Sequence, residues 1–506
     1  MVTASRSGEH QGHPLRSVAM EPLPRALAGT LVFLASGAVL VLEIVGIRLV
    51  GPYVGVTLQT SSAVIGVALA AIAYGAWLGG WLADRLPPRR LIPPALVLAG
   101  VATAVTLPVV RYAGELLRGS AVSGILLLTA LAVFVPSALL SAVPPLVVKL
   151  QLGDLRETGR VVGRLSSIGT LGGITATLGT GFVLVAALPS STIVLCLAGL
   201  LVAAGLALAW HQPTGWRQPT DRTARTAAIV GLVAAGAAGA AVTAPNPCDV
   251  ETAYHCARIV AEGDSGRLLL LNSARHSYVD LKDPRHLEFA YTQWIGALID
   301  LGAPPGTPIS TLHLGGGGFT LPRYLDATRP GGTNLVLEID GGLVALARER
   351  LRPAGTIRVG DARVGLRQQP TDAYDLVIGD AFGHLVVPWH LATRELVADV
   401  RRTLRPAGVY ALNAIDYPPQ RFVRAEVATV AAVFRHVALV APTDALAGRV
   451  GANFVILASD APLPLDALRS RLTTVGVIDG PELRTFTDGA QVLTDNHAPV
   501  DQLVAR

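Results

Sequence analysis

The most informative polar residues of this 506-residue chain lie in its carboxyl-terminal half, where a run of glycines precedes an acid. Gly315, Gly316, Gly317 and Gly318 follow the apolar segment ISTLHL, and Glu338 ends the next apolar segment, NLVLE. Glycines let the backbone approach a ligand closely in a tight strand-to-helix turn. A carboxylate at the end of the following strand can accept hydrogen bonds from both ribose hydroxyls of a nucleoside. The combination predicts a nucleoside site, with a flexible turn and a solvated strand-end carboxylate as the structural alternatives.

Further acids end the neighbouring strand-like segments. Asp361, followed by Ala362 in GDAR, could accept from an adenine amino group while the small alanine leaves room for the ring. Capping of the following helix is the alternative for Asp361, and it is the preferred interpretation for Asp340. Asp380, in IGDAFG, would face the reacting end of the ligand, where it could bind a cationic amine or take its proton. A structural turn acid is the alternative for Asp380.

These residues need a common scaffold, and the sequence around them alternates strand-like with helix-like segments. Strands are expected at 309–314, 334–340, 356–359, 374–381, 408–416, 434–442 and 452–459, and helices at 319–328, 341–351 and 388–404. Such alternation predicts a doubly wound parallel sheet, and ligands bind at the carboxyl ends of its strands. We therefore expect an α/β Rossmann-like domain over residues 303–506.

A smaller unit over residues 246–302 precedes this domain. Residues 258–281 alternate short apolar runs with turn signals, which predicts a small β-hairpin subdomain, and 286–302 has the apolar spacing of a helix. Cys248 and Cys256 begin the unit and could close a disulfide loop, which would suit an oxidising exterior; two unpaired thiols are the alternative. Their spacing is not that of a metal site and no Cys/His cluster accompanies them, so no metal is expected.

The amino-terminal half has the composition of a membrane domain. The chain is 51% hydrophobic and 15% charged, whereas soluble domains carry about 25% charged residues. A spanning helix needs about 20 mostly apolar residues. Seven stretches qualify, at about 27–50, 62–83, 91–110, 121–148, 165–188, 189–210 and 226–244. We expect a multi-span α-helical membrane domain over 25–245 after a polar tail over 1–24, with the Ala- and Gly-rich seventh stretch only marginally hydrophobic.

Basic residues concentrate in alternate loops of this half. They occur in the amino-terminal tail and after the second, fourth and sixth stretches, whereas the other loops hold only Arg111 and Arg118. Positive loops stay cytoplasmic, so the amino terminus is expected inside and, with seven spans, the soluble half outside. These loops also account for the formal charge of +5. The chain has no run of basic residues interleaved with aromatic residues, which is the pattern that would indicate nucleic-acid binding. The sequence therefore predicts a multi-pass integral protein of the cell membrane, in contact with the lipid bilayer.

Glu43 and Arg48 are ionisable residues within the first apolar stretch. Such residues usually face a bundle interior or a partner, because they are costly in contact with lipid. A transport or coupling site is the functional interpretation. An internal ion pair, or an Arg48 side chain that extends to the membrane interface, is the alternative.

Over about residues 250–506 the chain resembles the spermidine synthase family, in its membrane-fused bacterial form. The similar pieces are LHLGGGGFTLPRYL, LVLEID, RVGDAR, YDLVIGDAFG, LRPAGVY and LTDNHAPVDQL. The family joins a small β-domain to a Rossmann-like domain of the S-adenosylmethionine-dependent transferase type. It transfers an aminopropyl group from decarboxylated S-adenosylmethionine to a diamine such as putrescine. The resemblance implies that this adenosyl sulfonium, or S-adenosylmethionine itself, is a co-substrate and not a permanently bound cofactor. Members commonly dimerise, so a homodimer is a candidate assembly.

The resemblance also implies roles for individual residues. Glu338 would hold the ribose and Asp361 the adenine, while Asp380 would position and deprotonate the attacking amine. Tyr291 falls where the family has a substrate-binding tyrosine, and His276 falls at the position of a Gln that follows an early strand.

Besides His276, and Thr292 at a position where the family has a His or Gln, two acids of the family pattern are missing. The family turn is GGGDGG, and its Asp, which binds the aminopropyl end, is replaced here by Gly318; the second acid of the family's DxxD motif is replaced by Gly383. An aminopropyltransferase is therefore the first hypothesis. A methyltransferase or other group transferase that uses S-adenosylmethionine is the second, because amine-binding acids are lost. A transporter or sensor with a nucleoside- or polyamine-binding domain is the third.

Overall fold

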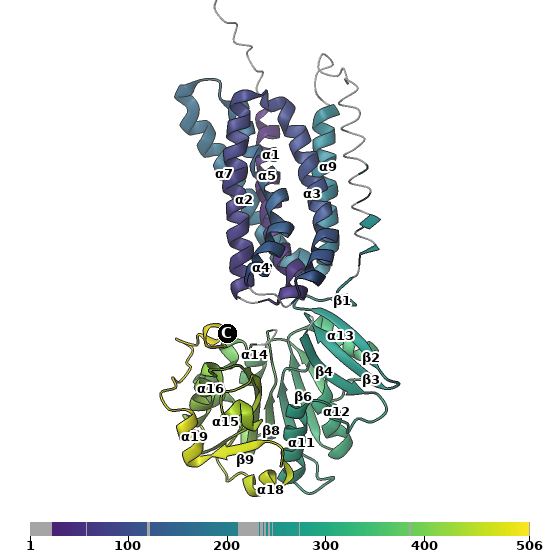
Figure 1. Cartoon of the computed structure of the whole chain (residues 1–506), viewed down its shortest axis with the longest axis vertical. Coiled ribbons are helices and arrows are strands. Elements are labelled where there is room, and N and C mark those ends of the chain that lie inside the picture. The colour runs from purple at the N-terminus through teal and green to yellow at the C-terminus, as the bar shows by residue number, and fades with distance from the viewer. Residues whose placement is uncertain are drawn as a thin grey trace, which may run out of the picture.

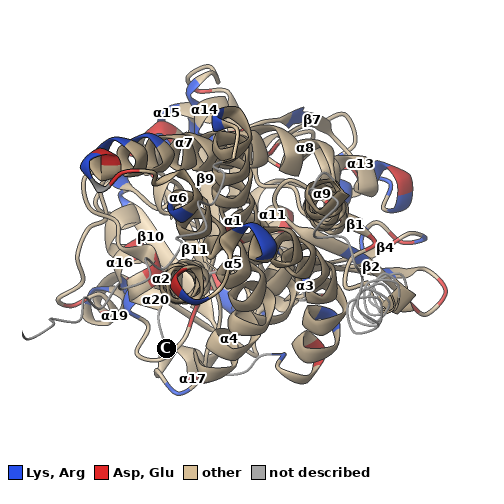
Figure 2. Ribbon diagram, turned by 90° about the horizontal axis from the view of Figure 1, so that it is seen from above, with Lys and Arg blue, Asp and Glu red and all other residues tan. Residues whose placement is uncertain are grey.

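The computed structural model describes residues 23–504 except for 57, 119–121, 211–231, 233–235, 237–238, 241–242, 245, 273 and 384–385. Its helical amino-terminal half stacks on a carboxyl-terminal half built around β-sheets (Figure 1). Viewed along the bundle, charged residues are sparse on the helices of the first half and more frequent on the elements of the second (Figure 2).

In the described part of the chain, six helices are long and apolar enough to cross a membrane. They run over Arg25–Val54, Leu58–Arg85, Pro88–Leu116, Val122–Gln151, Thr158–Ala187 and Ser190–Trp210. The first three are α1, α2 and α3, and the last is α9. The fourth consists of α4 (Val122–Thr129), a π-helical turn (Ala130–Phe134), α5 (Val135–Ser141) and α6 (Val143–Gln151); the fifth consists of α7 (Thr158–Gly179), a second π-helical turn (Thr180–Leu184) and α8 (Val185–Ala187). They confirm six expected helices, and the seventh stretch lies mostly outside the described residues.

Glycines set how closely these helices pack. A Cβ atom at position 75 would lie 2.1 Å from the carbonyl oxygen of Ala138, and one at position 79 would lie 2.5 Å from that of Ala142. Helix α2 therefore contacts α5 and α6 backbone to backbone, as the small-residue spacing of Gly75 and Gly79 favours.

The second half begins with a four-stranded antiparallel sheet in the order β1-β2-β3-β4. Its strands are β1 (Val250–Glu251), β2 (Cys256–Glu262), β3 (Gly266–Leu271) and β4 (Ala274–Asp280), and helix α11 (Ala290–Gly302) follows. Cys248 and Cys256 form a disulfide, so the expected pairing is confirmed. The disulfide links the segment that precedes β1 to the first residue of β2.

The larger sheet has eight strands in the order β12-β10-β11-β9-β8-β5-β6-β7. Their bounds are β5 (Ser310–Leu314), β6 (Thr333–Glu338), β7 (Thr356–Val359), β8 (Tyr374–Gly379), β9 (Leu404–Asp416), β10 (His436–Ala441), β11 (Ala452–Ser459) and β12 (Gly476–Asp479). Strands β9, β8, β5, β6 and β7 are parallel, whereas β11, β10 and β12 add to the β9 edge antiparallel. The sheet is thus mixed, and the short strand β12 was not anticipated.

Helices cover both faces of this sheet. They are α12 (Thr320–Thr328), α13 (Gly341–Arg350), α14 (Ala362–Arg367), α15 (Arg394–Thr403), α16 (Arg421–Ala431), α17 (Thr443–Leu446), α18 (Leu465–Arg471), α19 (Gly480–Phe486) and α20 (Val500–Val504). The helix expected over 388–404 begins only at Arg394, because the Thr393 hydroxyl accepts from the Leu396 amide and caps it there. A short 3₁₀ turn, Trp389–Leu391, stands before this cap.

Candidate active site

The carboxyl ends of β5, β6, β7 and β8 bring the predicted residues to one edge of the sheet. A cavity of about 90 Å³ at this edge, here named the glycine-turn cavity, is lined by Gly315, Gly317, Glu338, Asp361, Ala362 and Asp380. Residues far apart in the sequence meet because parallel strands end at a common edge. Gly316 and Gly318 belong to the same turn but do not line the cavity.

The turn requires glycine at two positions. Gly315 and Gly317 have φ angles of 97° and 50°, which side chains disfavour. A Cβ atom at position 315 would also lie 2.4 Å from the carbonyl oxygen of Asp380. The turn after β5 therefore packs directly against the end of β8.

Glu338 is buried at the end of β6 and faces the turn. One carboxylate oxygen accepts from the amides of Gly316, at 2.8 Å, and Gly317, at 3.2 Å. The other accepts from the Asp340 amide at 2.9 Å. A carboxylate has about four acceptor sites, so Glu338 can still accept from a hydroxyl group.

Asp340 has the expected capping role and a further role that the sequence did not indicate. One oxygen accepts from the amides of Gly342 (3.0 Å) and Leu343 (3.1 Å) at the start of α13. The other accepts from the Thr252 hydroxyl at 2.5 Å and lies 3.1 Å from His255 Nδ1. Burial raises the pKa of Asp340, but the hydrogen bonds outweigh it and leave that pKa below its usual value. Asp340 therefore joins the small sheet to the edge that carries Glu338.

Asp361 also caps a helix, the alternative considered for it from the sequence. One oxygen accepts from the Val364 amide at 2.9 Å at the start of α14. The other lies 3.1 Å from Nε2 of His390, which lines the glycine-turn cavity and was not anticipated. Asp361 can cap the helix with one oxygen and bind a ligand with the other, because the second oxygen lies beside His390 of the cavity lining. Ala362 is buried beside it and lines the same cavity.

Asp380 follows β8 and is held by two donors. The Tyr291 hydroxyl donates to one carboxylate oxygen at 3.0 Å, and the Asn413 amide donates to the other at 2.9 Å. Burial raises the pKa of Asp380 above its usual value, although both hydrogen bonds oppose this change. Burial, followed by the charge of Asp380, raises the pKa of Tyr291, so its hydroxyl remains a donor. Asn453 donates to the Asn413 carbonyl at 3.0 Å and so fixes the direction of that amide.

A second cavity of about 410 Å³ lies on the other side of Asp380. This amide cavity is lined by Arg275, His276, Tyr291, Asp380, Asn413 and Asn453, among others. His276 and Asp380 line both cavities. A group bound in one cavity can therefore meet a group bound in the other beside the Asp380 carboxylate.

Of the two positions that lack a family acid, Gly318 is closely packed, whereas Gly383 is open. The Ser277 hydroxyl accepts from the Gly318 amide at 3.0 Å, and a Cβ atom at position 318 would lie 2.6 Å from the Ser277 Cβ. An acid cannot replace Gly318 unless Ser277 moves. The Gly383 amide donates to the Val386 carbonyl at 2.8 Å in a local β-bridge.

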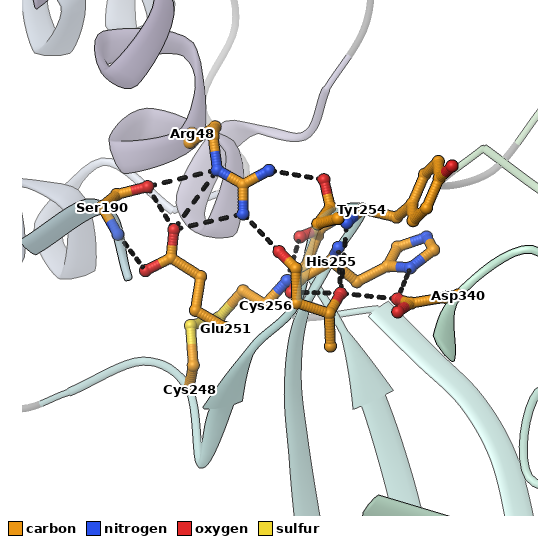
Figure 3. A network of polar contacts seen from close by, with 11 residues as sticks. Arg48, Ser190, Cys248, Glu251, Tyr254, His255, Cys256 and Asp340 are labelled. Carbon is orange, nitrogen blue, oxygen red and sulfur yellow. Dashed lines mark hydrogen bonds and ion pairs between the residues drawn. A yellow bond between two sulfur atoms is a disulfide. The ribbon is translucent and has the colours of Figure 1, made fainter. Parts of the chain in front are cut away.

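A polar network links the helical half to this edge (Figure 3). Arg48, near the end of α1, forms an ion pair with Glu251 at 3.3 Å and donates to the carbonyls of Thr252 and Ala253. Glu251 also accepts from the Ser190 amide at 3.0 Å. Thr252 in turn donates to Asp340, whose backbone amide donates to Glu338. Arg48 is therefore connected to Glu338 through two residues, Thr252 and Asp340.

Of the alternatives considered for Arg48, the network favours a side chain that extends to the interface over an ion pair with Glu43. Arg48 binds the soluble half, and its cationic end lies at the junction, not within the bundle. Arg48 therefore no longer supports the transporter hypothesis, for which only Glu43 remains.

Comparisons with known proteins point in one direction. A polyamine aminopropyltransferase of Vibrio vulnificus is 29% identical over 219 residues, which are 39% of this chain and 70% of the relative. One of Chromobacterium violaceum is 27% identical over 162 residues, 31% of this chain and 60% of the relative. The crystal structure of a probable spermidine synthase from Corynebacterium glutamicum has 28% identity and a TM-score of 0.46, covering 49% of this chain and 96% of that one. No family model matches the chain.

Proposed function

We propose that this chain, whose carboxyl-terminal half is spermidine synthase-like, is a membrane-anchored transferase that moves an aminopropyl group from decarboxylated S-adenosylmethionine to an amine. One observation carries the proposal. Asp380, held by Tyr291 and Asn413, lines two cavities, one beside the glycine turn and one that contains the amides of Asn413 and Asn453. A base between two cavities suits a transfer between two bound substrates.

The donor would occupy the glycine-turn cavity. Glu338 would accept from the ribose hydroxyls, as it already accepts from the turn amides. Asp361 would accept from the adenine amino group next to Ala362. The sulfonium and its transferable carbon would then lie toward Asp380, whose negative charge favours the positive sulfur.

The acceptor amine would enter the amide cavity. Its proton passes to Asp380, and its nitrogen lone pair forms a bond to the carbon next to sulfur while the carbon–sulfur bond breaks. The sulfur keeps the bonding electron pair and leaves as a neutral thioether, methylthioadenosine. Because burial raises the pKa of Asp380, this carboxylate is a stronger base than an exposed aspartate.

One observation favours a second candidate, methyl transfer from S-adenosylmethionine. The family's acid for the aminopropyl end is replaced by Gly318, and Ser277 fills the space that an acid would need. A methyl donor does not depend on that acid. The product would be S-adenosylhomocysteine instead of methylthioadenosine.

The identity of the released nucleoside tests both candidates. The purified full chain is supplied with either sulfonium donor and an amine mixture, and the nucleoside products are separated. We expect methylthioadenosine from the decarboxylated donor. We also expect Asp380→Asn to lower turnover by about 10²- to 10⁴-fold. Asp372→Asn is the matched control, because Asp372 is an exposed turn residue at φ 54°, a conformation that asparagine tolerates. Unchanged turnover in Asp380→Asn would refute the role of Asp380.

We further propose that the six apolar helices and the seventh apolar stretch, at 226–244, cross the cell membrane, which places the amino terminus inside and the soluble half outside. Their length and hydropathy, the alternate basic loops and the Cys248–Cys256 disulfide support this placement. A reporter enzyme that is active only in the cytoplasm, fused after Arg506, should be inactive. Activity of that reporter would show that the soluble half is inside.

A further inference from the structure

The amide cavity carries a positive charge that a cavity for simple diamines would not need. Arg275, on β4, lines this cavity together with Asp380 and the neutral amides of Asn413 and Asn453. Its guanidinium lies over the ring of Phe289, 5.7 Å from the ring centroid. No carboxylate among the described residues forms an ion pair or hydrogen bond with Arg275. Its charge is therefore available to a ligand.

Two acids, Asp380 and Glu288, line the same cavity, and neither forms an ion pair with Arg275. Asp380 is engaged by Tyr291 and Asn413 and faces the reacting amine. Arg275 is exposed and would repel an ammonium group placed beside it, so its own position in the cavity favours an anionic group.

A carboxylate is the group that Arg275 recognises best. A planar guanidinium binds a carboxylate with two parallel hydrogen bonds. Glu288 also lines the cavity; its side chain lies 3.1 Å from His286 and is 42% exposed, so it can receive an ammonium group. The cavity thus offers a cation and an anion for a zwitterionic group, and a separate base for a reacting amine.

We propose that the acceptor is a diamino acid, an amine that carries a carboxylate, and that Arg275 binds this carboxylate while Asp380 deprotonates the attacking amine. This inference rests on the proposed transfer function. The attacking nitrogen forms its bond to the donor carbon, the sulfur keeps the electron pair of the broken bond, and the proton goes to Asp380. The acceptor's carboxylate is not consumed.

Putrescine and ornithine form a matched pair of probes, because ornithine is putrescine with one added carboxylate. The purified full chain is assayed with each at equal concentration and a saturating donor, and nucleoside release is measured. We expect kcat/KM for ornithine to exceed that for putrescine at least about 10-fold, an effect typical of one charge-assisted contact. Arg275→Glu should invert this preference, and Arg275→Lys should keep its direction.

Arg285→Glu is the control for long-range charge, because Arg285 is exposed nearby but lines neither cavity. It should leave the ratio of the two acceptors unchanged. Donor affinity, measured by calorimetry, should be equal in all variants and shows that they fold. A preference for putrescine that Arg275→Glu does not change would overturn this inference and leave the transfer function standing. No product from either acceptor with either donor would overturn both.

Discussion

The two cavities that meet at Asp380 differ in the residues that line them and in the elements that supply those residues. The glycine-turn cavity keeps the acids expected for an adenosyl compound, and Glu338 is fixed there by three backbone amides. The amide cavity combines the neutral amides of Asn413 and Asn453 with the charged side chains of Arg275 and Glu288. The donor-binding residues follow the parallel strands β5, β6 and β7, whereas the second cavity draws on β4, α11, β9 and β11. Separate elements allow the acceptor to change while the donor site is kept.

The largest test of this comparison is Glu338→Gln. The substitution leaves one acceptor oxygen instead of two, so the amide NH₂ group must face either the donating amides of Gly316 and Gly317 or that of Asp340. We expect donor affinity to fall at least about 100-fold and stability to fall by about 1–3 kcal/mol, because a buried donor loses its partner. Calorimetry and thermal unfolding measure the two effects. An unchanged donor affinity would show that the donor binds elsewhere.

Restoring the family acid tests the boundary between the cavities. Gly318→Asp alone should destabilise the chain by about 1–3 kcal/mol, because the new side chain collides with Ser277. Combined with Ser277→Gly it should fit, and the double variant should prefer decarboxylated S-adenosylmethionine over S-adenosylmethionine about 10-fold more than the parent does. Competition binding measures the preference. If the double variant gains no preference, position 318 does not face the aminopropyl end.

Tyr291→Phe tests the base through pH. The Tyr291 hydrogen bond lowers the pKa of Asp380, so its removal should raise a pKa that burial has already raised. Because the carboxylate form accepts the proton, activity should disappear as pH falls through this pKa. The acidic limb of the kcat profile should therefore move to higher pH in the variant. Movement to lower pH would contradict Asp380 as the base.

The smallest expected effect comes from the junction with the helical half. Arg48→Ala leaves Glu251 without its cation and loosens the segment that holds Asp340 beside Glu338. Donor affinity should fall about threefold, with acceptor KM unchanged, because coupling through such networks is modest. Arg85→Ala, which removes another arginine from the bundle, is the control. An equal effect on both substrates would mean that Arg48 supports the whole domain.

The sequence by itself predicted most of the elements and placed the proposed donor residues at the ends of strands. Apolar stretches of spanning length predicted six helices, and the order of strand, glycine turn and acid predicted β5, β6 and the position of Glu338. Local signals suffice here, because helix length, strand alternation and turn chemistry depend on neighbours in the sequence. The parallel order then places strand-end acids together without further information.

Only the tertiary structure decided the rest of the site. Asn413 and His390 lie in segments without a motif and become functional candidates only through their contacts with Asp380 and Asp361. Arg48 pairs with Glu251, 203 residues away, and not with Glu43 on its own helix. These contacts join residues distant in sequence, and no local periodicity encodes which distant side chain will fill a given space. Ser277 is likewise distant in sequence from the glycine turn, and it is Ser277 that fills the space an acid at position 318 would need.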